Sequence, residues 1–200
     1  MPRTSLDQTV LDREEVPALT PAGERLLDVA SRLFYSHGIR AVGVDRVAAE
    51  AGTTKKTLYD IFGSKDLLVA LYLHRRGVRW RSHLTERLAA REPGTDRLLG
   101  VYDVIAEWHA DQDRGCAFVN AYAEIGTADH PALPVIRADK AYMRELFRRL
   151  AVEAGRADAE RTGDTLHLLY EGALVLSTAG ARPDAISEAR RAAQDLLARN

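Results

Sequence analysis

Residues 44–62 read VDRVAAEAGTTKKTLYDIF, and this stretch decides the fold. Its first half carries apolar residues at helical spacing until Gly52, and Thr54 can then cap a short second helix. The residues expected to pack these two helices together are Val47, Ala48, Ala51, Leu58 and Phe62. Because small alanines allow a close crossing, the second helix can protrude far enough to enter a major groove of DNA. The stretch therefore predicts a helix-turn-helix.

The exposed face of the second helix would carry the groups that contact DNA. Lysine can donate to guanine O6 and N7, threonine can hydrogen-bond a base, and tyrosine can donate to a phosphate oxygen. Ser64 can cap the next helix, where N–H groups point outward, and Lys65 adds an ammonium beside them. The predicted DNA contacts are Thr54, Lys55, Lys56, Thr57, Tyr59 and Lys65. The alternatives are a solvated charged face for Lys55 and Lys56 and a packing role for Tyr59.

Helical signals continue on both sides of this motif. Thr20 can cap a helix that begins at Pro21 and closes at Gly38, and the Ser64-capped helix can run towards Ala90. Further helices are predicted over 95–108, 117–125, a segment ending at 154, 158–179 and 184–199. No segment alternates with period two. The predicted fold is all-α, with about nine helices: a three-helix helix-turn-helix domain followed by a helical bundle.

Charge and cysteine content narrow the function classes. The chain has a net charge of −1, but residues 21–80 hold ten Lys/Arg against six Asp/Glu, which is +4. The near-zero net charge argues against a general nucleic-acid coat protein, and the positive excess over 21–80 places polyanion binding in the N-terminal third. With Cys116 as its one cysteine, the chain forms no internal disulfide, and it shows no export signal or membrane-spanning stretch. We therefore expect a cytoplasmic protein without a membrane partner.

Residues 20–75 resemble the DNA-binding domain of TetR family transcriptional regulators. The matching features are Leu33-Phe34 with His37-Gly38 at the end of the first helix, VAAEAG over 47–52, and TKKTLYDIFGSKDLL over 54–68. The resemblance implies a flexible arm over 1–19, a DNA-binding domain over 20–75 and a ligand-binding and dimerisation domain over 76–200. It further implies a repressor that binds a palindromic operator in double-stranded DNA as a homodimer through residues 158–199, and that a small-molecule effector releases.

Two positions depart from the family pattern. Family members usually carry Thr or Ser where this chain has Val42 and Gly43, so the hydroxyl that would cap the helix from Val44 is absent. Asp45 stands where some relatives place a basic or base-contacting residue. A carboxylate there can accept a hydrogen bond from cytosine N4 or is repelled by phosphate. Asp45 is therefore left out of the predicted contacts.

The region after residue 76 carries aromatic and polar residues on helices that surround a ligand cavity in this family. The predicted pocket residues are Trp108, Phe118, Asn120, Tyr122, Glu124, Tyr142, Met143 and Tyr170. Asn120 and Glu124 share one face of an otherwise apolar segment, and buried polar groups need partners, of which a ligand is one. The alternative is that these aromatics form the core alone and that the protein binds DNA without an effector.

An enzyme is the competing function class. Cys116 with His109 invites a thiol nucleophile, and Asp111 with Asp113 invites a metal-dependent hydrolase. The sequence gives the cysteine no evident orienting group, and the acidic run has neither paired Cys/His spacing nor the glycine placement of a calcium loop. We therefore predict no catalytic residue, no metal ligand and no cofactor, and a surface or interface pair for His167 and Glu171.

Overall fold

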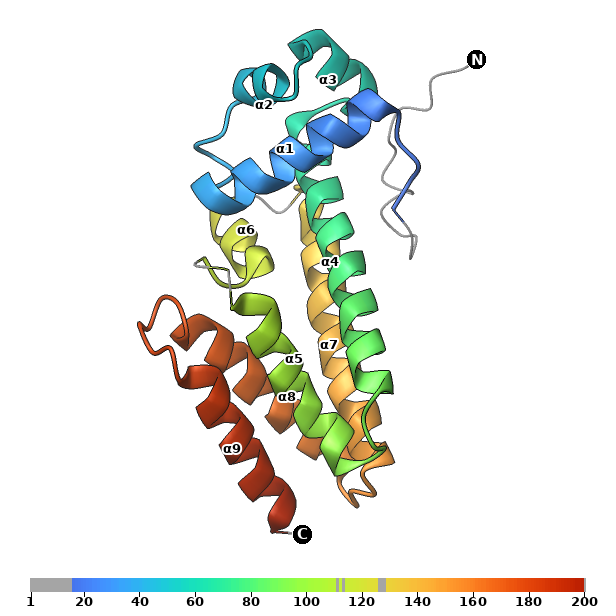
Figure 1. Cartoon of the computed structure of the whole chain (residues 1–200), viewed down its shortest axis with the longest axis vertical. Helices are drawn as coiled ribbons and strands as arrows, with labels where there is room; N and C mark the ends of the chain where they lie inside the picture. The colour runs from blue at the N-terminus through green and yellow to red at the C-terminus, as the bar shows by residue number, and fades with distance from the viewer. Residues whose placement is uncertain (1–15, 111, 113, 126–128, 200) are drawn as a thin grey trace. The chain divides into compact units, whose positions relative to one another are not determined.

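The computed structural model describes residues 16–110, 112, 114–125 and 129–199, and the regular structure within them is helical (Figure 1). The helices are α1 (Pro21–His37), α2 (Val44–Glu50), α3 (Lys55–Phe62), α4 (Lys65–Ala89), α5 (Thr95–His109), α6 (Ala117–Ile125), α7 (Ala132–Glu153), α8 (Ala159–Leu176) and α9 (Ala185–Ala198). The predicted all-α fold is confirmed over these residues. Most of the arm predicted over 1–19 lies outside them.

The predicted helix starts follow from side-chain caps. Thr20 is extended and its hydroxyl accepts from the Gly23 N–H at 3.2 Å, with Pro21 directly after it. Proline costs no hydrogen bond there, because the first N–H groups of a helix have no intrahelical partner. Gly52 has φ +63 in the turn after α2, a left-handed conformation that glycine adopts without steric cost.

Two helix boundaries need comment. The sequence indicates a loop or an irregular helix start over 127–134, and α7 begins within that range at Ala132, with Pro134 in its first turn, where proline is tolerated. The Ala132 N–H donates to His130 Nδ1 at 3.1 Å. Helix α8 ends at Leu176 rather than at residue 179, and the Ser177 and Thr178 hydroxyls bond back to the Leu174 carbonyl at 3.1 and 3.3 Å.

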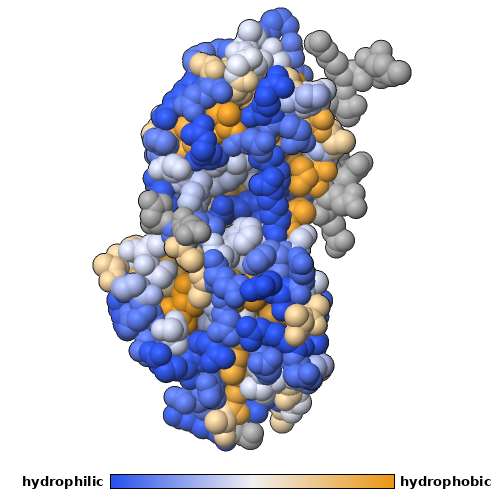
Figure 2. Space-filling view, viewed as in Figure 1, coloured by the Kyte–Doolittle hydropathy of each residue, from blue (hydrophilic) through white to orange (hydrophobic). Residues whose placement is uncertain are grey.

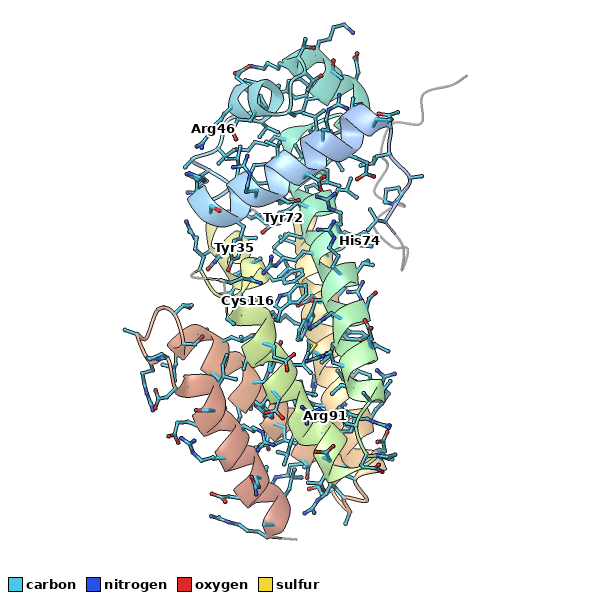
Figure 3. All side chains as sticks on the ribbon, in the orientation of Figure 1. Tyr35, Arg46, Tyr72, His74, Arg91 and Cys116 are labelled. Carbon is cyan, nitrogen blue, oxygen red and sulfur yellow. The ribbon has the colours of Figure 1, made fainter. Side chains whose placement is uncertain are left out.

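The chain packs as two compact units. The first comprises residues up to Trp80 together with Ala117–Ala138, so α6 and the first residues of α7 pack in the same unit as the helix-turn-helix. Its core includes the leucines and aromatics of α1 and α4, with the Phe34 and Tyr72 rings 5.9 Å apart. Figure 3 labels Tyr72 on α4. A buried Arg75 on α4 holds α1, donating to Ser31 Oγ at 2.9 Å and pairing with Asp28 at 2.8 Å.

The second unit comprises Arg81–Cys116 together with residues from Asp139 onward. In it α9 packs against both α5 and α8, and the buried Tyr102 hydroxyl donates to the Leu166 carbonyl at 2.7 Å. A Cβ on Gly163 would lie 2.6 Å from the backbone of Arg148, so α7 and α8 are in contact at their backbones there. Arg144 and Arg148 each donate two hydrogen bonds to Asp164 beside that contact.

Candidate nucleic-acid interface

The helix-turn-helix has the predicted core. Val47, Leu58 and Phe62 are fully buried, and Ala48 and Ala51 are nearly so. Helices α2 and α3 contact each other, and each also contacts α1. Because α3 is fixed on its inner side by this core, its outer side chains project from a rigid support, and Figure 2 shows mostly hydrophilic residues over this end of the unit.

Thr54 and Thr57 define the start of α3. The Thr54 hydroxyl accepts from the Thr57 N–H at 3.1 Å, and the two hydroxyl oxygens lie 2.9 Å apart. Both predicted contact residues therefore have a structural partner in the free protein. Their hydroxyls retain further donor and acceptor capacity, so a role toward DNA stays a prediction.

The lysines of α3 are exposed and paired with carboxylates. Lys55 Nζ lies 3.2 Å from Asp45 Oδ2 on α2, and Lys56 Nζ lies 2.7 Å from Asp60 Oδ2 on its own helix. Tyr59 is exposed as well. The three side chains can reach a polyanion or a base edge without a change in the core, because each lysine ammonium has three donors and its carboxylate uses one.

Lys65 differs from the two lysines of α3 because it is partly buried. Its Nζ donates to the Ile39 carbonyl oxygen at 2.6 Å and lies 5.9 Å from the centre of the Phe34 ring. Burial lowers the pKa of Lys65 below its ordinary value. The predicted N-terminal cap of α4 is present, since the Ser64 hydroxyl accepts from the Leu67 N–H at 3.0 Å. Lys65 thus fastens the chain after α1 to the start of α4.

Helix α6 is bonded to the turn between α1 and α2. The Glu124 carboxylate accepts from the Arg40 N–H at 2.8 Å, and Arg40 Nε donates to the Glu124 carbonyl at 2.6 Å. Glu124 was predicted as a ligand contact, but its carboxylate is engaged with this turn. At the start of α4, Asp66 Oδ1 lies 3.4 Å from His130 Nε2. Sequence reasoning found neither contact, because each joins residues more than 60 positions apart.

The other predicted pocket residues are divided between the two units. Phe118, Asn120 and Tyr122 belong to the first, where Phe118 is buried and Tyr122 exposed. Trp108, Tyr142, Met143 and Tyr170 belong to the second. Their pocket role stays a prediction.

Within the second unit, Tyr170 is buried and its ring lies 5.6 Å from that of Phe147. A charged cluster adjoins this aromatic region. Lys140 Nζ donates to both Glu171 oxygens at 2.9 and 3.0 Å and lies 3.5 Å from Cys116 Sγ. Burial alone would raise the pKa of Glu171, but His167 and Lys140 together hold it below its ordinary value. The sequence paired His167 with Glu171 and missed Lys140, which lies on another helix.

Residues Asp111 and Asp113, which suggested a metal site, lie outside the described part of the chain. Among the residues that are described, no three His, Cys, Asp or Glu side chains gather closely enough to hold a metal ion. Nor does any described helix combine the length and the apolar character needed to cross a membrane.

Comparison with known proteins matches part of the chain to transcriptional regulators. Residues 26–71 match the family model described as bacterial regulatory proteins, tetR family. An uncharacterized HTH-type transcriptional regulator from Mycobacterium tuberculosis is 33% identical over 78 residues, which is 39% of this chain and only 39% of that protein's length.

Solved structures match over most of the chain. SCO4454, a TetR-family transcriptional regulator from Streptomyces coelicolor, is 30% identical, with a TM-score of 0.82 over 89% of both chains. A transcriptional regulator from Saccharomonospora viridis, solved in complex with choline, is 18% identical, with a TM-score of 0.74 over 90% of this chain and 96% of that one.

Proposed function

Because the chain belongs to the TetR family of transcriptional regulators, we propose that it is a repressor that binds a palindromic operator as a homodimer and is released by a small molecule. The observation that carries the proposal is the exposed face of α3, where Lys55, Lys56 and Tyr59 project from a buried helix-turn-helix core. In this proposal residues 20–75 bind DNA and residues 76–200 bind the effector and the second copy.

DNA recognition would proceed through α3 in the major groove. The lysine ammonium groups would donate to guanine acceptors, and Tyr59 would donate to a phosphate oxygen. Two heads related by a twofold axis would enter successive major grooves, so the half-sites would lie about 34 Å or a multiple of it apart.

An apolar stripe on α8 supports the homodimer. Leu168 is 72% exposed, and Val175 and Leu176 are also exposed although both are large apolar residues. Gly172 is exposed between them, which permits close approach of a second helix. A twofold interface buries the same patch on both copies, so a stripe on the 158–199 segment suits a symmetric dimer.

The effector part of the proposal draws on the second unit. Its buried aromatic cluster adjoins the Lys140 and Glu171 pair, so apolar surface and fixed charges lie together, as in many ligand sites. The choline complex of the Saccharomonospora viridis protein supports small-molecule binding in this fold. Release from DNA would require that the effector bind one arrangement of the dimer more tightly than the other, because equal affinity shifts no equilibrium.

Footprinting of the purified protein on DNA upstream of its own gene tests the DNA-binding function. We expect protection of an inverted repeat, and we expect Lys55→Ala with Lys56→Ala to abolish the protection. Protection of no segment by the wild type, at low or moderate salt, would refute the function.

The effector half is tested by repeating the footprint with candidate compounds, beginning with choline. A compound that removes the protection supports release. A crystal structure of the free dimer that shows no cavity among α4 to α8 would refute this half and leave a DNA-binding protein that acts through dimerisation alone.

A further inference from the structure

Asp45 and Lys55 form an ion pair between two helices on the proposed DNA-binding surface. Asp45 lies in the first turn of α2 and Lys55 is the first residue of α3, and their Oδ2 and Nζ atoms are 3.2 Å apart. The Asp45 side chain is 75% exposed and that of Lys55 is 50% exposed. The packed core beneath, with Val47 on α2 and Leu58 on α3, fixes the two backbone positions relative to each other.

General DNA affinity does not explain this carboxylate, and stability explains it only in part, because a carboxylate in the first turn of α2 suits the positive end of the helix dipole. An ion pair as exposed as this one contributes little to stability. A negative charge on a DNA-binding surface also opposes phosphate, so Asp45 weakens binding to any sequence that offers it no hydrogen-bond donor. In the major groove, cytosine N4 and adenine N6 supply such donors.

The donor and the acceptor of the pair match one base pair. A G·C pair presents guanine N7 and O6 as acceptors beside the cytosine N4 donor. O6 and N4 are hydrogen-bonded to each other, so they lie about 3 Å apart, close to the spacing between Asp45 Oδ2 and Lys55 Nζ. An A·T pair also sets a donor, adenine N6, beside an acceptor, thymine O4, at this spacing. Thymine, however, gives the ammonium one acceptor next to a methyl group, whereas guanine gives it two acceptors.

We propose that Asp45 and Lys55 read a single G·C pair as one unit, with Lys55 donating to guanine and Asp45 accepting from cytosine N4. The inference rests on the proposed DNA-binding function. Asp45 thereby becomes a specificity-determining residue, which lowers affinity for other sequences while permitting the correct one. The ion pair holds both groups ready in the free protein, so neither has to be moved far to meet its base.

The experiment is a selection of binding sites from a randomised pool of duplex DNA with four proteins. These are the wild type, Asp45→Ala, Lys55→Ala and the control Asp60→Ala. Asp60 suits the control because it also pairs with a lysine of α3, namely Lys56, but from within the same helix. Removing Asp45 or Asp60 changes the net charge of the DNA-binding surface by the same amount. Circular dichroism of each variant checks that it is folded.

We expect the wild type to select an inverted repeat with a fixed G·C pair in each half. Asp45→Ala and Lys55→Ala should each lower the preference at that same position by about tenfold, and Asp60→Ala should keep it. If Asp45→Ala keeps the wild-type preference and merely binds all sequences more tightly, Asp45 only screens Lys55 and the inference is overturned. If the wild type enriches no sequence, the DNA-binding function itself fails.

Discussion

Replacing Lys65 with methionine separates two roles for one side chain. The change keeps most of the aliphatic length and removes the ammonium. The lost interactions are the 2.6 Å hydrogen bond to the Ile39 carbonyl and the contact with the Phe34 ring. A hydrogen bond from a charged donor contributes about 1.5–3 kcal/mol, and a cation–π contact contributes about 0.5–1 kcal/mol.

Part of the lost stability is recovered, because methionine is uncharged and its burial does not require a charged group to be desolvated. Partial burial removes some of the hydration of the Lys65 ammonium, and this unfavourable desolvation lowers the pKa of Lys65. We therefore expect a net loss of about 1–2 kcal/mol, which for a chain of this length lowers Tm by about 2–8 °C. Differential scanning calorimetry measures the change.

The same variant tests the phosphate contact. An ammonium has three donors, so the bond to Ile39 leaves two for a phosphate oxygen. Loss of one phosphate contact lowers the slope of log K against log salt by about one. Fluorescence anisotropy with the operator, at several salt concentrations, measures this slope.

Lys56→Met is the matched control, because Lys56 is 81% exposed and pairs only at the surface with Asp60. It should change Tm by less than about 2 °C while weakening operator binding. If Lys65→Met left Tm unchanged, the bond to Ile39 would not hold the start of α4. If the salt slope stayed at the wild-type value, Lys65 would not contact phosphate.

Three further predictions concern the second unit. Gly163→Ala should lower Tm by several degrees, since the new Cβ would lie 2.6 Å from the Arg148 backbone and overpacking costs about 1–3 kcal/mol; an unchanged thermal scan would contradict this contact. Hydrogen bonds from Arg148 and Arg144 hold the pKa of Asp164 well below its usual range. The stability that these hydrogen bonds give the folded protein is therefore present above the unfolded-state pKa of about 3.9 and is lost as pH falls below it. The Tm difference between wild type and Asp164→Asn should be largest near neutral pH and shrink in acid, and a constant difference would disprove the linkage. Leu168→Glu should convert the proposed dimer to a monomer in analytical ultracentrifugation, whereas a dimer that persists would place the interface elsewhere.

Local signals in the sequence were sufficient for the helices. Thr20, Thr54 and Ser64 cap helices through bonds within three residues, and glycine turns follow from backbone conformation alone. The start of α7 was left open, because a proline is compatible both with a loop and with a first helical turn. Tertiary packing decides between those two, and the sequence does not display it.

The sequence predicted which residues form the exposed face of the candidate site, but not which distant residues the site residues contact. Lys55, Lys56 and Tyr59 were found because the motif puts them on the exposed face of α3, and they are exposed. The bond from Lys65 to Ile39 and the attachment of Glu124 to Arg40 depend on which segments meet in space. Those contacts join residues 26 and 84 positions apart, beyond the reach of helical periodicity.

The link between α6 and the turn after α1 tolerates a substitution at either of its two residues. Of its two bonds, one joins the Glu124 side chain to the Arg40 backbone, and the other joins the Arg40 side chain to the Glu124 backbone. A substitution at either position removes one bond and leaves the other in place. Homologues can therefore vary at positions 40 and 124 independently, without the paired changes that a direct side-chain to side-chain contact would impose.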